Sequence, residues 1–145
     1  MTQKTRTAKI IACSAAQELA SAAIAHATEN GWSVAAVVLD PWGHTVSSAR
    51  MDGVAPAILD FATDKAYTAT LGRPTSAFFE RMNSTDELRL GLANRPRLCA
   101  WDGGLPIYEG QNLVGAIGVS GGQGHEDVAC AEAALHATGL GTAPD

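Results

Sequence analysis

The sequence predicts an α+β domain in which helices pack on an antiparallel sheet of about five strands. Apolar residues recur at helical spacing in separate segments of the chain, and short apolar runs of strand length lie between these segments. Several of the runs follow one another through tight turns. Parallel strands would need long crossovers, so the pairing is expected to be antiparallel. The 145 residues, 46% hydrophobic and 17% charged, suffice for one domain with a core, residues 1–145.

The first helix is expected over residues 7–29, with Asn30-Gly31 as its end. One of its faces carries residues at steps of three and four: Ile11, Ala15, Leu19, Ala22 and His26. His26 falls in the last turn of this stripe. It is interpreted as a residue at the edge of the core or a partner of the helix dipole, with a ligand role as the alternative.

Two strands are expected next, joined by a turn. Residues 34–39 form a continuous apolar run, and Asp40-Pro41-Trp42-Gly43 is typical of a tight turn. The returning strand covers residues 44–50. Alternation would place four of its side chains on one face: His44, Val46, Ser48 and Arg50. This mostly polar face is either solvated or the lining of a pocket.

A second helix is expected from Pro56 to about Leu71-Gly72. Its buried stripe would consist of Ile58, Ala62, Ala66 and Ala69. Lys65 lies beside this stripe. Its stem would cover apolar surface, or its ammonium group would act as a cation for an anionic ligand or as a desolvated base.

Residues 73–98 are expected to form two short helices, over residues 75–82 and 85–92, in a mobile or ligand-covering segment. A strand over residues 98–101 should follow, then a hairpin turn at Asp102-Gly103-Gly104 and a return strand over residues 105–108.

The stretch over residues 113–127 predicts a buried strand, a glycine loop and the start of a helix that runs to about Thr138. Glycine weakens a strand, so Gly115 and Gly118 inside it indicate the close approach of another backbone or of a ligand. The loop glycines Gly121, Gly122 and Gly124 do not form a phosphate cradle. No Gly-Lys-Ser/Thr follows them, and the third glycine of a dinucleotide fingerprint is missing.

Two acidic residues, Glu126 and Asp127, fall in the first turn of this last helix, where they would repel a phosphate. They either complement the helix dipole, or one of them faces a cleft as an acid, a base or a hydrogen-bond acceptor.

Composition and charge exclude several classes of partner. The net charge of −5 and the absence of a basic cluster argue against a nucleic acid or an anionic membrane as partner. No apolar run approaches the ~20 residues of a membrane span, and residues 10–25 form an amphipathic pattern rather than a secretory signal. The three cysteines, Cys13, Cys99 and Cys130, match no zinc or c-type haem motif. We therefore expect a reduced, cytoplasmic chain with small buried thiols.

Five segments together resemble the GlcG/HbpS family, which includes the C-terminal domain of PduO-type proteins: residues 37–44, 49–53, 64–69, 103–107 and 114–121. The resemblance covers about residues 8–140, and His125 before the acidic pair departs from it. It implies a profilin-like fold around an antiparallel sheet and assembly into dimers and often octamers. It also implies either haem binding or degradation, or a small-molecule role in a catabolic pathway, because fold constrains chemistry only loosely.

The haem hypothesis needs an axial ligand, an apolar slot and cations for two propionates. Candidate ligands are His26, His44, His125 and His136, and candidate propionate partners are Arg50 and Lys65. No pattern in the sequence places any of these histidines in an apolar slot.

The favoured hypothesis is a small-molecule protein that acts on a carboxylate-bearing metabolite and requires no cofactor. Arg50 would bind the carboxylate, His44 would move a proton, and Glu126 or Asp127 would be the partner acid or base. The remaining candidates are Lys65, the turn at Gly103-Gly104, and the N–H groups of Gly121, Gly122 and Gly124, which would stabilise an oxyanion. Such a site suits tautomerisation, isomerisation, or hydration and hydrolysis. A third hypothesis is an oligomeric binding module without turnover.

Overall fold

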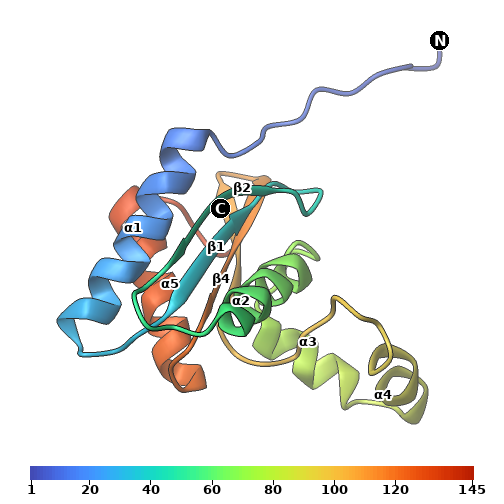
Figure 1. Cartoon of the computed structure of the whole chain (residues 1–145). Helices are drawn as coiled ribbons and strands as arrows, with labels where there is room; N and C mark the ends of the chain where they lie inside the picture. The colour runs from blue at the N-terminus through green and yellow to red at the C-terminus, as the bar shows by residue number, and fades with distance from the viewer.

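The computed structural model describes residues 1–145 and has an antiparallel four-stranded sheet with five helices. The strand order is β2-β1-β4-β3. Helices α1 and α5 cover one face of the sheet and α2 lies against the other (Figure 1). The strands are β1 (Ala35–Leu39), β2 (Thr45–Arg50), β3 (Gly104–Glu109) and β4 (Asn112–Ser120). The helices are α1 (Cys13–Glu29), α2 (Pro56–Ala69), α3 (Thr75–Met82), α4 (Asp86–Leu92) and α5 (Gly124–Thr138). The predicted α+β class and antiparallel pairing are confirmed, with four strands instead of about five.

The strand predicted over residues 98–101 is wrong, which accounts for the difference in strand number. This segment packs against helix α2 and does not pair with a neighbouring strand. The backbone N–H of Cys99 donates to Oγ1 of Thr68 at 2.8 Å, and the guanidinium of Arg97 lies 3.6 Å from the centre of the Tyr67 ring. Asp102-Gly103 is consequently not a hairpin turn, and Gly104 is already the first residue of β3.

The single polar face predicted for the second strand is also wrong, because a β-bulge interrupts the alternation. Val38 pairs with Ser47 and Leu39 pairs with Thr45, so Val46 is an extra residue in β2. Val46 packs against the core on the α1 and α5 side. Arg50 pairs with Ala35, whose side chain lies in the cluster on the α2 side.

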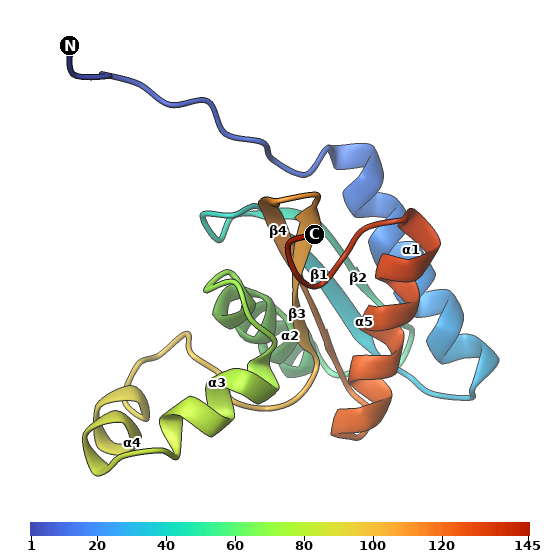
Figure 2. The ribbon, with the colours of Figure 1, turned by 180° about the vertical axis from the view of Figure 1, so that it is seen from behind.

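Helix α1 begins six residues later than the predicted residue 7. Before it, the chain runs alongside β4, where the N–H of Ile11 donates to the carbonyl of Val114 at 2.9 Å. Residues 1–10 are exposed and extend away from the domain (Figures 1 and 2). No helix has the length and apolar character needed to cross a bilayer.

The core has two parts, one on each face of the sheet. The larger part lies between the sheet and α1 and α5, and the smaller lies between the sheet and α2. Helix α2 approaches β4 most closely at Gly118, where a Cβ atom would lie 2.0 Å from the carbonyl oxygen of Ala62. The close approach expected at this glycine is therefore that of another backbone, and it fixes the position of Lys65, three residues further along α2.

Helices α3 and α4 form a projection that we call the arm, residues 73–97. Helix α4 buries none of its residues, and the arm extends from the α2 side of the domain (Figures 1 and 2). The two short helices match those predicted for this segment, with α4 beginning one residue later.

Candidate functional site

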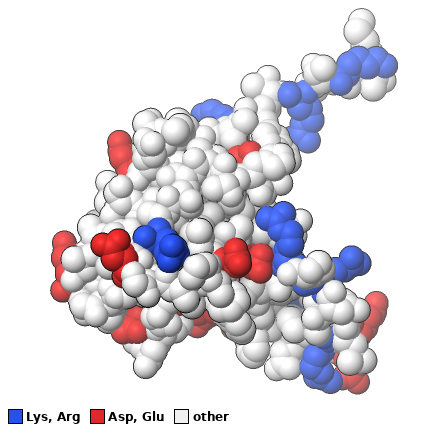
Figure 3. All heavy atoms as spheres, in the orientation of Figure 1, with Lys and Arg blue, Asp and Glu red and all other residues white.

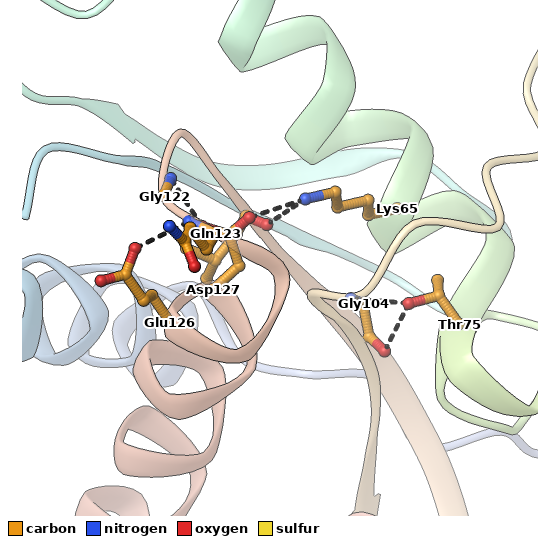
Figure 4. Close-up of polar contacts among 8 residues, drawn as sticks. Lys65, Thr75, Gly104, Gly122, Gln123, Glu126 and Asp127 are labelled. Carbon is orange, nitrogen blue, oxygen red and sulfur yellow. Dashed lines mark hydrogen bonds and ion pairs between the residues drawn. The ribbon is translucent and has the colours of Figure 1, made fainter.

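A buried ion pair lies where α2, α5 and the end of β4 meet. Nζ of Lys65 is 2.9 Å from Oδ2 of Asp127 and donates to the carbonyl of Val119 at 3.0 Å (Figure 4). The two residues are only 3% and 2% exposed, respectively. The other carboxylate oxygen, Oδ1 of Asp127, accepts from the N–H of Gly122 at 2.9 Å. The pair thus joins two helices to the glycine loop.

Local sequence explains how the two charges meet. Lys65 lies between Ala62 and Ala66, which are both fully buried against the sheet, so its stem begins in the core. Gly103 leaves room for the ammonium group. A Cβ atom there would lie 3.1 Å from Nζ of Lys65 and 2.4 Å from the carbonyl oxygen of Val119. The φ of 125° at Gly103 also favours glycine.

Burial decides the electrostatics of this site. Desolvation raises the pKa of Asp127 above the ordinary aspartate value, although the hydrogen bond and charge of Lys65 and the N–H of Gly122 act in the opposite direction. Beneath it, burial and then the charges of Asp127 and Glu126 raise the pKa of Cys130 to about 11. The raised pKa brings the Asp127 carboxyl group closer to neutral pH, which suits an acid or base. The raised pKa of the Cys130 thiol makes it a poor nucleophile.

A solvent-open hollow of about 290 Å³ lies over the ion pair. Its wall includes the indole of Trp101, which is 59% exposed and meets the Phe61 ring edge-on at 5.2 Å between centroids. The N–H of Gly124, the first residue of α5, has no acceptor within the chain. The lining residues are Ile58, Lys65, Trp101, Asp102, Ser120, Gly121, Gly122, Gly124 and Asp127. The hollow thus offers carboxylates, a cation, free N–H groups and an aromatic wall within a volume suited to a small ligand.

Of the residues proposed from the sequence, Lys65, Asp127 and the three loop glycines meet around this hollow. Gly103 lies directly beneath the ion pair, and Gly104 lies behind it, where its N–H donates to Oγ1 of Thr75 at 3.1 Å. Sequence reasoning missed Trp101 and Asp102. Their position directly before Gly103-Gly104 was the available signal.

Two details of the proposed chemistry change. Oε1 of Glu126 accepts from the N–H of Gln123 at 2.8 Å, so this carboxylate caps α5 and does not line the hollow. The N–H of Gly122 is engaged by Asp127 and is not free to stabilise an oxyanion. Among the loop residues that line the hollow, Gly121 and Gly124 have N–H groups without an acceptor in the chain.

The structure does not bring His44 and Arg50 to the hollow. His44 follows the turn at the far end of β1, is 80% exposed, and has Nδ1 3.3 Å from Oδ2 of Asp40. Arg50 lies in the same cross-strand row as Ser120, two strands away, but its guanidinium donates to the carbonyl of Val54. Arg50 thereby holds the loop before α2.

The other histidines lie apart from the hollow and from one another. His26 is half-buried with its ring edge-on to Trp32 at 5.9 Å, and His125 and His136 are exposed on α5. No three His, Cys, Asp or Glu side chains gather as metal ligands. The expectation of buried thiols holds for Cys130 but is wrong for Cys13, which is exposed at the start of α1.

Comparison with known proteins decides the family. Residues 11–136 match a family described as "Haem degrading protein HbpS-like". The chain belongs to this HbpS-like family. It is 37% identical to the Escherichia coli K12 protein GlcG over 108 residues, which cover 72% of this chain and 79% of GlcG. It is 35% identical over 127 residues to an uncharacterised 15.0 kDa protein from the dhaT–dhaS intergenic region of Citrobacter freundii. These residues cover 86% of this chain and 89% of that protein.

Solved structures of three other proteins share the fold. Klebsiella pneumoniae ORFY superimposes with a TM-score of 0.88 at 31% identity and covers 96% of this chain and 97% of its own. A double mutant of Streptomyces reticuli HbpS gives a TM-score of 0.84 at 28% identity, and the match covers 94% of this chain and 92% of the HbpS chain. A PduOC:haem complex gives a TM-score of 0.85 at 23% identity, and the match covers 92% of this chain and 99% of the PduOC chain. At this identity the comparison shows likeness of fold alone.

Proposed function

We propose that this HbpS-like chain binds a small polar metabolite in the hollow over Lys65 and Asp127 and moves a proton on it. One observation carries the proposal: a buried carboxyl group with a raised pKa, paired with a buried ammonium group, forms the floor of a solvent-open hollow. Perturbed groups in a cleft are typical of acid–base sites.

The chemistry follows from the groups that line the hollow. The Asp127 carboxylate would take a proton from a carbon next to a carbonyl group and return it to another atom of the same ligand. The Lys65 ammonium and the N–H of Gly124 would stabilise the negative oxygen that forms. The class of reaction is a tautomerisation or isomerisation, and no cofactor is needed. The ligand would carry a carbonyl or carboxylate oxygen, without a contribution from His44 or Arg50.

The pair Asp127→Asn and Glu126→Gln tests this proposal. The assay is NMR detection of solvent deuterium uptake at C3 of pyruvate, 2-oxobutyrate and phenylpyruvate. At least one of these probes should exchange, and Asp127→Asn should slow that exchange about 10²-fold or more, the usual contribution of a general base. Glu126→Gln is the matched control, since it changes a neighbouring carboxylate that only caps α5.

Equal exchange rates in both folded variants would exclude Asp127 as the base. Saturable binding of a probe at the hollow without any exchange would instead favour a binding module without turnover.

Haem binding is the second candidate, because the family description names haem degradation and one structural neighbour is a haem complex. The hollow over Asp127 contains no histidine, and Arg50 is engaged by the carbonyl of Val54 away from it. Lys65 is then the only cation in this hollow, whereas a haem has two propionates. A hollow of about 480 Å³ beside the β1–β2 turn is lined by Arg6, Lys9 and Trp42, and its two cations would bind the propionates of a haem, which would supply iron chemistry. No histidine lines this hollow. His44, two residues after Trp42, is the candidate ligand that a haem bound there would have to recruit.

A further inference from the structure

Charge is divided unevenly between the domain and its two projecting segments. The arm, residues 73–97, carries five arginines and three acidic residues, and residues 1–9 carry three cations and no acid. The remaining chain has only two cations, Arg50 and Lys65, against twelve acids. Most of the basic side chains visible in Figure 3 accordingly lie on the N-terminal segment and the arm. An acidic domain with basic projections is electrostatically complementary to copies of itself.

The arm also presents apolar side chains to solvent. Phe79 on α3 is 54% exposed and Leu90 on α4 is 73% exposed. Arg73, Arg81 and Arg95 have no carboxylate within ion-pair distance. A segment that carries both exposed apolar side chains and unpaired cations is suited to a partner with exposed apolar and acidic groups.

The rim of the hollow has that complementary character. The Trp101 indole is exposed there, and Asp102 beside it has no basic partner. Asp60 does not line the hollow, but it is exposed and unpaired on α2 directly before Phe61, whose ring meets Trp101. No residue of the arm lines the hollow of its own chain. The covering role expected for this segment is therefore not fulfilled within one copy, and the arm of a second copy has the complementary character to fulfil it.

We infer that the chain self-associates with the arm of one copy seated over the hollow of a second copy. Phe79 and Leu90 contact the exposed indole of Trp101, and Arg81 lies among the unpaired carboxylates near the hollow. The partner copy thus completes the site and excludes water from the Lys65–Asp127 pair. This arrangement does not depend on the ligand or its chemistry.

Tryptophan fluorescence tests the inference without any ligand. The chain has three tryptophans, so the variant Trp32→Phe/Trp42→Phe reports on Trp101 alone. Sedimentation and acrylamide quenching are measured over the same range of protein concentration. As the complex forms, the Trp101 emission should shift to the blue and its quenching constant should fall. Added salt should reverse both changes, because exposed charges are screened.

Two sets of arm variants, made in this background, identify the contact. Phe79→Ser/Leu90→Ser and, separately, Arg81→Glu/Arg95→Glu should each weaken association at least tenfold, or about 1.4 kcal/mol, and return Trp101 to the quenching of the monomer. Ile10→Ser, at an exposed apolar residue before α1 and away from the arm, is the control and should leave both readouts unchanged. A chain that stays monomeric, or one that associates while Trp101 remains fully quenchable, would overturn the inference.

Discussion

Replacing Lys65 with methionine is expected to lower the free energy of unfolding by about 3–5 kcal/mol, the usual cost of leaving one buried charge of a pair without its partner. Methionine keeps most of the apolar stem but removes the ammonium group that contacts Asp127 and Val119. Urea denaturation at neutral pH measures the loss. The double variant Lys65→Met/Asp127→Leu is the control and should recover much of it, because no unpaired charge is then buried.

The loss in Lys65→Met should also depend on pH in a defined direction. Lys65 lowers the pKa of Asp127, so its removal raises that pKa further above 3.8, the value in the unfolded chain. A raised carboxyl pKa means that the folded state binds the proton more tightly than the unfolded state. The variant should therefore lose stability relative to the wild type as pH rises from about 4 through the raised pKa. A pH-independent loss below 1 kcal/mol would contradict a structural role for the pair.

Gly118→Ala is expected to lower the free energy of unfolding by about 3 kcal/mol, at the upper end of the cost of overpacking. The new methyl group would meet the carbonyl oxygen of Ala62 at 2.0 Å and the backbone nitrogen of Ala66 at 2.6 Å. Since both neighbours are backbone atoms of one helix, the only relief is to move α2 away from β4. That movement would also displace Lys65 from Asp127.

Gly91→Ala is the matched control for this substitution. Gly91 lies in α4 and a Cβ atom there would meet nothing within 4 Å. Alanine should therefore stabilise the chain by about 0.5–1 kcal/mol through the unfolded state. Comparison of the urea denaturation midpoints of the two variants isolates the destabilisation caused by the clash of the new methyl group with α2, that is, the steric effect of Gly118→Ala. Equal effects of the two substitutions would mean that α2 does not rest on β4 as described.

The fold followed from the sequence where local pattern and tertiary packing agree. The alanine stripe predicted the buried face of α2, and the glycines within β4 predicted the close approach of another backbone or of a ligand. The structure confirms the first and resolves the second, because the backbone of α2 lies against Gly118. The expectation failed where a side chain replaced a strand as hydrogen-bond partner. Thr68 receives the N–H of Cys99, and nothing in residues 98–101 indicates this. The bulge at Val46 likewise depends on pairing with β1.

The candidate site was only partly predictable for a similar reason. The spacing places Glu126 and Asp127 together at a helix start, but which one is buried depends on how α5 packs against the sheet. The structure turns Asp127 inward to Lys65 and Glu126 back to the N–H of Gln123. His44 was expected near the glycine loop, but the antiparallel direction of β1 carries the turn before it to the opposite end of the sheet.

The most direct test of the central claim locates ligand binding on the protein. Amide and indole NMR shifts of the ¹⁵N-labelled chain are followed during titration with each 2-oxo acid and, separately, with hemin. We predict that an acid which exchanges deuterium perturbs the Trp101 indole and the amides of Gly121, Gly122 and Gly124, and that hemin leaves these signals unbroadened. Two results would contradict the claim. In the first, no acid perturbs the signals of the glycine loop, while hemin broadens them. In the second, hemin is the only compound that binds, its binding perturbs the signals of His44 and Trp42, and His44→Ala abolishes it.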